Sequence, residues 1–498
     1  MATHPSLLAV AGVVLSSIVV AASARAQAPP ADPHGWPSAG TVELPTASFE
    51  FKNGYPTPAS AEKLLEFRTL SRAVEVFQDN FAALSMFRFR QGLRDFGARD
   101  ANQIVIWQSR LDAQTLLLTG DTETVYASTF LDLKRDGPTV VEVPPQIQGL
   151  ADDMWMRYLG DLGIAGPDRG KGGKYLFIPP GYKGDLTPGY LSFESTTNGV
   201  WLLLRALDDK PEAAATRLKQ FRIYPMAKAL EPPKTAFLDS SGKAVDTIPP
   251  DTAQAFEDLS KLLQEEPADV ITSRERFFLA SIGIEKGKPF APDDKLRAIL
   301  DQAARLAGAI CRANTFASPD PDAIIYPGKR WRLAFIGSGY KFDSQGYVNL
   351  DRLSAFAYAA TGITPAMASK ATGKGSQYIW TPVDSSGAFL DGARSYRLRI
   401  PPKVPVKDFW SIVVYDSGSR SLLQNGQRSP SISSYANPLL NEDGSVDVYF
   451  GPEAPAGKEK NWIRTVPGKG WFTVLRFYGP LAAFFEHKWE LGDITELR

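Results

Sequence analysis

The spacing of hydrophobic residues predicts helices near the start of the chain and in its middle. Between residues 60 and 96, apolar side chains such as Leu70, Val74 and Phe77 recur at every third or fourth position, which is typical of a helix with one buried face. Gly97 follows near the predicted end of this helix. Four further segments are predicted to be helical, at residues 252–265, 273–284, 292–312 and 349–360.

Short runs of β-branched and aromatic residues, separated by turn residues, predict two groups of strands. The first group covers residues 103–107, 115–118, 124–131, 139–143, 175–178 and 199–204, and a helix near 211–221 closes it. The second group covers residues 396–400, 409–415, 446–450 and 471–478. We therefore expect a multidomain α+β protein with a mixed α/β N-terminal domain, a helical middle segment and a C-terminal antiparallel β-sandwich or jelly roll.

The first residues resemble an export signal. An apolar run at residues 7–20 precedes Ala24-Arg25-Ala26, a pattern that predicts a signal peptide cut before Gln27. An uncleaved membrane anchor stays open as the alternative, because residues 1–6 contain no lysine or arginine. The predicted division is a signal peptide at 1–26, a flexible leader at 27–57, an N-terminal mixed domain at 58–229, a helical connecting region at 230–374 and a C-terminal sandwich at 375–498. We expect a periplasmic or secreted protein that does not contact the membrane once the signal is removed.

Composition narrows the possible chemistry. Fifty-five lysines and arginines balance 55 aspartates and glutamates, and this zero net charge argues against nucleic-acid binding. One cysteine and three histidines argue against a metal site or a Ser–His–Asp triad. No phosphate-binding loop, dinucleotide fingerprint or Gly-x-Ser-x-Gly elbow has the required spacing. We therefore predict no metal and no cofactor, and expect Asp, Glu, Tyr and Arg to carry any acid–base chemistry.

Two polar clusters at strand ends are the candidate functional residues. Asp121, Glu123 and Tyr126 lie where one predicted strand begins, and Asp416 and Arg420 follow the end of another. The leading hypothesis is an exported enzyme that acts on a small-molecule or glycan-like ligand in a cleft between the two domains. In it, Glu123 acts as acid or base, Tyr126 and Asp416 orient the ligand, and Arg420 pairs with an anionic group. This hypothesis requires both clusters to face one cavity.

The predicted catalytic residues are thus Glu123, Tyr126 and Asp416. The predicted ligand-binding residues are Arg420, Tyr378 and Asp121. Three alternatives stay open. Both clusters can be strand-end residues in structural hydrogen bonds, and the protein can be a non-catalytic ligand-binding protein of the cell envelope or a structural subunit. The sequence does not decide whether the protein is an enzyme, and it leaves the oligomeric state open.

Several longer motifs point to a family. They include TETVY at 122–126, DDMW at 152–155, GPDRG at 166–170 and PPGY at 179–182, followed by GSQY at 375–378 and NEDGSVD at 441–447. With these motifs the chain resembles the paired bacterial families called domain of unknown function 1254 (about residues 60–225) and domain of unknown function 1214 (about residues 370–490). The family pattern Asn-x-Asp-Thr-x-Tyr is Asp121-x-Glu123-Thr124-x-Tyr126 here. The resemblance implies a multidomain α+β fold with a sandwich-like C-terminal module, and it implies no defined function.

Overall fold

The computed structural model describes residues 40–44, 47–208 and 210–497, which form two compact units, one ending at Arg68 and one beginning at Thr69. The predicted signal peptide, residues 1–26, lies outside the described residues. In the first unit, strands β1 (Gly40–Leu44), β2 (Ala47–Lys52) and β3 (Tyr55–Pro56) pair in an antiparallel sheet. The second half of the predicted leader therefore contains strands.

The long helix predicted at residues 60–96 is divided into α1 (Pro58–Asp79) and α2 (Phe81–Phe96). The division falls at Asn80, which is buried. Its side-chain amide donates to the carbonyl of Val76 (2.9 Å) and accepts from the indole N–H of Trp155 (3.2 Å). Helix α2 ends at Gly97, whose φ of +119° favours glycine, as the sequence predicts.

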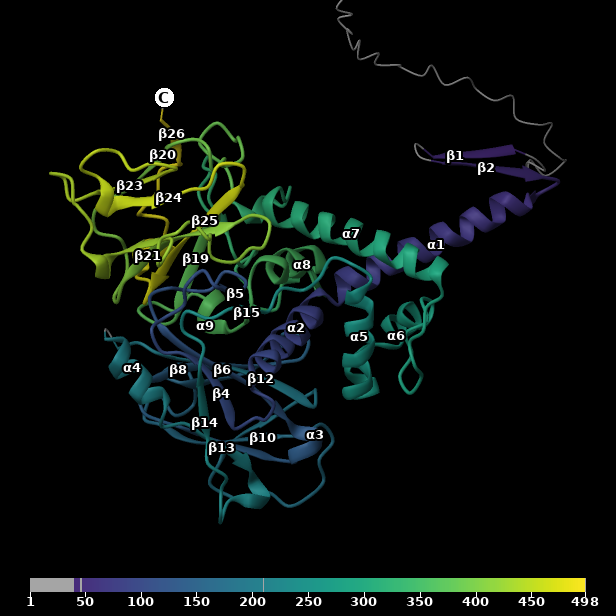
Figure 1. Cartoon of the computed structure of the whole chain (residues 1–498), viewed down its shortest axis with the longest axis horizontal. Helices are drawn as coiled ribbons and strands as arrows, with labels where there is room; N and C mark the ends of the chain where they lie inside the picture. The colour runs from purple at the N-terminus through teal and green to yellow at the C-terminus, as the bar shows by residue number, and fades with distance from the viewer. Residues whose placement is uncertain (1–39, 45–46, 209, 498) are drawn as a thin grey trace, which may run out of the picture. The chain divides into compact units, whose positions relative to one another are not determined.

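The N-terminal domain contains two sheets around one hydrophobic core. A six-stranded sheet has the order β14 (Ala236–Asp239), β4 (Gln103–Trp107), β6 (Val125–Asp132), β12 (Gly199–Ala206), β8 (Ile147–Asp153) and β9 (Tyr158–Gly163). A four-stranded sheet has the order β11 (Leu191–Glu194), β10 (Gly173–Ile178), β7 (Thr139–Val143) and β13 (Arg222–Pro225). Residues of both sheets and of α4 (Pro211–Leu218) share this core, and the other face of the six-stranded sheet packs against α2 (Figure 1).

The middle of the chain is helical, as predicted. Helices α5 (Gln254–Glu265), α6 (Ser273–Ala280), α7 (Asp294–Phe316) and α8 (Leu350–Ala359) lie within a few residues of the four predicted segments. The Asp293 carboxylate caps α7 by accepting from the Leu296 N–H (2.8 Å). A short helix that was not predicted, α9 (Pro365–Ala368), follows. Other short elements are α3 (Leu133–Asp136), α10 (Ala482–Phe485), the pair β5 (Thr115–Leu116) and β15 (Val245–Asp246), and the pair β17 (Asp343–Ser344) and β18 (Tyr347–Val348).

The C-terminal domain also contains two sheets around one core. A five-stranded sheet has the order β16 (Arg332–Leu333), β19 (Ser376–Thr381), β25 (Trp471–Tyr478), β21 (Trp410–Asp416) and β22 (Ser431–Ser433). A four-stranded sheet has the order β24 (Trp462–Arg464), β23 (Val446–Gly451), β20 (Tyr396–Ile400) and β26 (Thr495–Glu496). Residues of both sheets share one hydrophobic cluster, which is compatible with the predicted sandwich. The predicted multidomain α+β class is confirmed.

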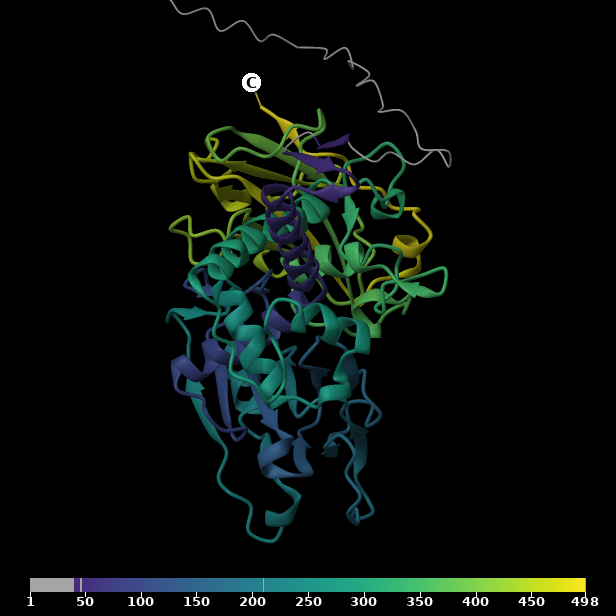
Figure 2. The ribbon, with the colours of Figure 1, turned by 90° about the vertical axis from the view of Figure 1, so that its right-hand side faces the viewer.

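The two domains pack together within the second unit. Figures 1 and 2 show the blue strands of the N-terminal domain and the yellow strands of the C-terminal domain at opposite ends of it, with α8 and α9 between them in Figure 1. The Tyr415 hydroxyl donates to the Gly120 carbonyl (2.8 Å), and the Thr119 N–H donates to the Arg420 carbonyl (2.8 Å). These bonds join the segment before β6 directly to the end of β21.

Candidate functional site

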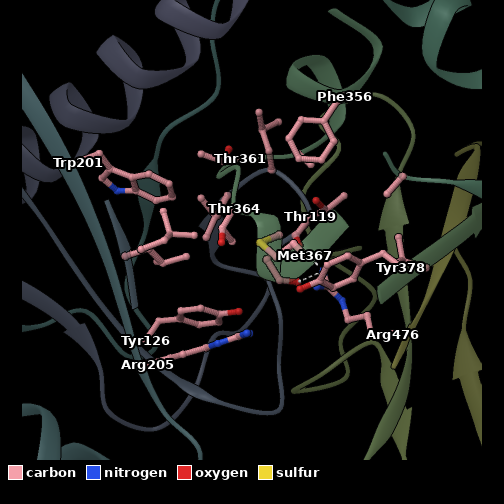
Figure 3. A pocket seen from close by; sticks show the side chains of 18 of the residues that line it. Thr119, Tyr126, Trp201, Arg205, Phe356, Thr361, Thr364, Met367, Tyr378 and Arg476 are labelled. Carbon is pink, nitrogen blue, oxygen red and sulfur yellow. Dashed lines mark hydrogen bonds between the residues drawn. The ribbon is translucent and has the colours of Figure 1, made fainter. Parts of the chain in front are cut away.

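A cavity lies between the two domains. Its walls come from β6, β8 and β12 of the six-stranded sheet, from β19 and β25 of the five-stranded sheet, and from α2, α8 and α9 (Figure 3). Many lining side chains are apolar: Phe89, Leu117, Leu118, Leu150, Trp201, Leu203, Ala334, Phe356, Ala360, Met367, Trp380 and Val474. Such a lining is typical of small-molecule sites.

Polar side chains form a row on the N-terminal wall. Tyr126 of β6 lies directly opposite Arg205 of β12, and Arg205 lies opposite Gln148 of β8. Paired residues project their side chains from the same face of a sheet, so these three lie side by side on the cavity face. The neighbours Val125 and Leu204 belong to the domain core on the opposite face.

The C-terminal wall contributes a matching pair. Tyr378 of β19 lies directly opposite Arg476 of β25, and the Arg476 guanidinium carbon is 5.2 Å from the centre of the Tyr378 ring. Figure 3 shows the polar ends of Tyr126 and Arg205 pointing toward those of Tyr378 and Arg476. The site therefore contains two tyrosine–arginine pairs, one from each domain, that face each other across the cavity.

The two ends of the cavity differ in polarity. In Figure 3, Trp201 and Phe356 lie in the upper part of the view, and the two tyrosine–arginine pairs lie in the lower part. Thr364 lies between these two ends. The indole N–H of Trp201 donates to Ser128 Oγ (2.8 Å), so its hydrogen-bonding requirement is met outside the cavity. The upper end therefore offers mainly apolar surface to a bound molecule.

The tyrosine–arginine end is cationic. Burial and the nearby Asp121 raise the pKa of Tyr126 to about 12, although Arg205 and Arg476 lower it, so its phenol is protonated at neutral pH. Burial lowers the pKa of both arginines, but neighbouring groups raise it by more, so both pKa values lie above their usual range. The neighbour with the largest effect is Tyr126 for Arg205 and Tyr415 for Arg476. Two cations and a neutral phenol thus meet at this end.

Asp161 of β9 provides a carboxyl group to the cavity lining. It accepts hydrogen bonds from Thr364 Oγ1 (2.7 Å) and Tyr158 Oη (3.1 Å). Burial raises the pKa of Asp161, although these hydrogen bonds and Arg205 lower it. A buried carboxyl group with a raised pKa is suited to proton transfer, so Asp161 is a candidate acid or base.

The predicted site residues Tyr126 and Tyr378 line this cavity. Asp121 lies close to it: its Oδ2 accepts from Thr124 Oγ1 (3.0 Å), and its buried Oδ1 has no hydrogen-bond partner among the described residues. Asp121 also acts electrostatically on both arginines. The catalytic or binding roles of these residues stay predictions.

Glu123 does not line the cavity but lies in the interface between the domains. Its carboxylate accepts hydrogen bonds from Ser433 Oγ (2.8 Å) and Ser431 Oγ (3.2 Å) of β22. Burial and the nearby Asp121 raise the pKa of Glu123, while the hydrogen bonds from Ser433 and Thr122 lower it. These contacts are those of a residue that holds the two domains together.

Asp416 and Arg420 also lie away from the cavity lining. Asp416 accepts from the Lys469 ammonium (2.6 Å) and the Gly418 N–H (2.7 Å). Burial raises the pKa of Asp416, but these partners outweigh it and hold the value below its usual range. The Arg420 guanidinium carbon lies 4.1 Å from the centre of the Tyr358 ring. The structure therefore does not bring Glu123 and Asp416 to one cavity, because each is engaged by other partners.

The sequence analysis missed Arg205, Arg476 and Asp161. Both arginines interrupt strongly apolar strands, Leu202-Leu203-Leu204-Arg205 and Val474-Leu475-Arg476-Phe477. A lone arginine within a buried strand is unusual and is the signal that could have found them. Asp161 has no such signal, because the short strand β9 that contains it includes two glycines and no β-branched residue, and so is not recognisable as a strand.

Metal sites and membrane-spanning helices are both absent from residues 40–44, 47–208 and 210–497. Within these ranges no group of three or more His, Cys, Asp or Glu side chains is placed to hold a metal ion. No helix in the same ranges has both the length and the apolar character that crossing a membrane requires.

Comparisons with known proteins agree with the motifs. A family model described as a protein of unknown function, DUF1254, matches residues 101–225, and another so described, DUF1214, matches residues 375–482. No curated protein matches the chain.

Two solved structures match most of the chain, and the first of them is similar in fold. The crystal structure of the VPA0106 protein from Vibrio parahaemolyticus has a TM-score of 0.54 at 17% identity, over 86% of this chain and 100% of that one. That of an uncharacterized protein from Burkholderia cenocepacia has a TM-score of 0.40 at 12% identity, over 88% and 96%. The two family models match in N- to C-terminal order, which confirms the predicted pairing of domain of unknown function 1254 with domain of unknown function 1214 in this chain.

Proposed function

We propose that the protein binds a small, largely apolar molecule in the cavity between its two domains. The observation that carries the proposal is the lining of the cavity, which consists largely of apolar and aromatic side chains with a few polar groups gathered at one end. Apolar surface contributes binding free energy, while a few fixed polar groups set orientation. This lining suits a compact apolar molecule better than a hydrophilic glycan.

A neutral fluorescent probe tests the proposal. N-phenyl-1-naphthylamine brightens in apolar surroundings and carries no charge at pH 7.5, so its titration reports the cavity independently of electrostatics. Thr361 lines the cavity, and Thr361→Phe adds a bulky ring there. Thr216 lies exposed on α4, so Thr216→Phe adds the same ring elsewhere. We expect saturable binding to the wild type and Thr216→Phe, and weaker binding to Thr361→Phe. Equal binding by all three proteins would contradict the proposal.

Acid–base catalysis on the bound molecule is a second candidate, favoured by Asp161. This carboxyl group lines the cavity, and its burial raises its pKa. Glu123 and Asp416 do not line the cavity, so a catalytic proposal rests on Asp161 instead. Compounds that displace the probe are incubated with the wild type and with Asp161→Asn, and products are followed by mass spectrometry. Turnover by the wild type alone supports catalysis, and absence of turnover by both supports binding only.

We also propose that the protein is exported to the periplasm or secreted, with cleavage before Gln27. The apolar run at 7–20 and the Ala24-x-Ala26 pattern support this proposal. The mass of the protein purified from its native cells, fractionated into envelope and cytoplasm, tests it. A chain that retains residues 1–26 in the cytoplasmic fraction would contradict it.

A further inference from the structure

Two buried arginines at one end of the cavity lack carboxylate partners. Arg205 is 8% exposed, and within the described residues its guanidinium donates one hydrogen bond, to Ser376 Oγ (3.3 Å). Arg476 is 6% exposed and donates to the Thr119 carbonyl and to Tyr415 Oη (2.7 Å), while its buried Nε has no hydrogen-bond partner in the same part of the chain. Neither guanidinium forms an ion pair with any carboxylate in the described part of the chain. Both therefore retain hydrogen-bonding capacity that the protein does not use.

Burying a cation without a counter-charge is costly. Arg352 shows how this chain meets that cost elsewhere: it is 9% exposed and pairs with Asp320 (2.6 Å) and Asp322 (2.7 Å). At the cavity, Asp121 acts electrostatically on both arginines but forms no ion pair with either. Within the described residues, the hydrogen bonds of the two guanidinium groups therefore go to neutral groups and not to a carboxylate.

The second carboxyl group near the arginines is engaged by other partners. Asp161 accepts one hydrogen bond at each oxygen, Oδ1 from Thr364 and Oδ2 from Tyr158, and burial raises the pKa of this carboxyl group. The phenols of Tyr126 and Tyr378, which point toward the same space, can donate further hydrogen bonds (Figure 3). The cluster therefore has the donors and the charge to bind one anionic group.

We propose that the bound molecule is a monocarboxylate with an apolar body, and that its carboxylate lies between Arg205 and Arg476. The inference rests on the proposed function and specifies the class of ligand. Planar guanidinium groups match the two oxygens of a carboxylate. One carboxylate at this position supplies both guanidinium groups with the directly bonded anionic partner that they lack among the described residues. The apolar body extends toward Trp201 and Phe356 at the other end of the cavity.

A second pocket is consistent with entry of an anion. This pocket shares Gln148 with the cavity, and its lining contains two ion pairs, Arg217 with Asp208 and Lys407 with Asp408, together with Lys374. Lys374 leaves the lining with one positive charge in excess, and such a charge attracts anions by long-range electrostatics. Gln148 lies beside Arg205 in the sheet, so it separates this pocket from the arginine end of the cavity.

Competition for the neutral probe tests the ligand class. Decanoate and decanamide have the same chain length but differ in charge, and each is titrated against N-phenyl-1-naphthylamine at pH 7.5 together with decyl phosphate. Hydrogen bonds to charged groups contribute enough for a preference of about tenfold or more. We expect decanoate to displace the probe at about tenfold lower concentration than decanamide, and at lower concentration than decyl phosphate.

Variants assign this preference to the arginines. Arg205→Met removes one cation but keeps an apolar side chain of similar length, and Arg397→Met removes an exposed arginine of β20 as the matched control. We expect Arg205→Met to bind the probe but to prefer decanoate by no more than about twofold, and Arg397→Met to behave like the wild type. Arg205→Lys, which keeps the charge, is expected to retain part of the preference.

The outcomes separate this inference from the proposed function. If the probe binds but decanamide competes as well as decanoate, or decyl phosphate competes best, the carboxylate assignment is wrong and the cavity still binds small molecules. If Arg205→Met binds the probe and keeps the full preference, the arginine assignment is wrong. If the wild type does not bind the probe at all, the proposed function itself fails.

Discussion

The contact between Glu123 and β22 yields a quantitative prediction. Ser433 is 2% exposed, and its hydroxyl donates to the Glu123 carboxylate across the domain interface (2.8 Å). Glu123→Ala removes the acceptor for both Ser431 and Ser433. Hydrogen bonds to charged groups contribute about 1.5–3 kcal/mol, and an unsatisfied buried donor costs about 1–3 kcal/mol. Because the lost bonds are not additive, we expect the free energy of unfolding to fall by about 2–4 kcal/mol.

A double-mutant cycle isolates the contact. Glu123→Ala, Ser433→Ala and the double variant are unfolded in urea and followed by tryptophan fluorescence. The first cooperative transition is compared, because two domains can unfold separately. We expect the double variant to lose about 1 kcal/mol less than the sum of the single losses. Glu123→Gln, which keeps one acceptor oxygen, is the matched control and is expected to lose less than Glu123→Ala.

Two results would refute this reasoning. Additivity of the two single substitutions to within about 0.3 kcal/mol would show that the bond does not contribute to stability. Loss of probe binding in a folded Glu123→Gln protein would return Glu123 to the functional site, where the sequence analysis placed it and the structure does not.

Three further predictions concern pH, backbone geometry and the second polar cluster. Burial raises the pKa of Glu266 to about 7, so the protonated carboxyl group contributes fully to stability below about pH 4.5, and this contribution is lost as the pH rises through about 7. In urea unfolding, the wild type is therefore expected to lose up to about 3 kcal/mol of unfolding free energy over this pH range, relative to Glu266→Gln. Gly375 has a φ of +65°, and a Cβ at this position would overlap the Ala366 carbonyl. Gly375→Ala is therefore expected to lower the unfolding free energy by about 2–5 kcal/mol, and an unchanged urea midpoint would contradict this. Asp416→Asn is expected to leave the dissociation constant of the neutral probe unchanged, since Asp416 does not line the cavity.

Periodicity predicts the elements that have one clear pattern. The four middle helices and strands such as β4, β7, β20 and β25 were found within a few residues, because their apolar spacing or β-branched content is strong. β8 and β19 were missed, although both line the cavity. β8 contains Gly149, Asp152 and Asp153, residue types that are depleted in strands, and tertiary pairing with β12 and β9 overrides this preference.

The candidate site was only partly predictable for a related reason. Tyr126 and Tyr378 were selected, because they occur in conspicuous motifs. Their partners Arg205 and Arg476 become neighbours through strand register, and the two pairs meet only when the domains pack. Sequence analysis placed acids and bases at strand ends, where turns are polar. The structure places the cationic groups within strands, on the face that the domains bury together.

The most direct test of the cavity is a crystal structure with 10-bromodecanoate. Bromine is located by its anomalous scattering, independently of the fit of the chain. The account predicts a bromine peak within the cavity near Trp201 and Phe356, with the carboxylate between Arg205 and Arg476. Bromine found only on the protein surface, or a cavity that stays free of the compound at concentrations that displace the fluorescent probe, would contradict it.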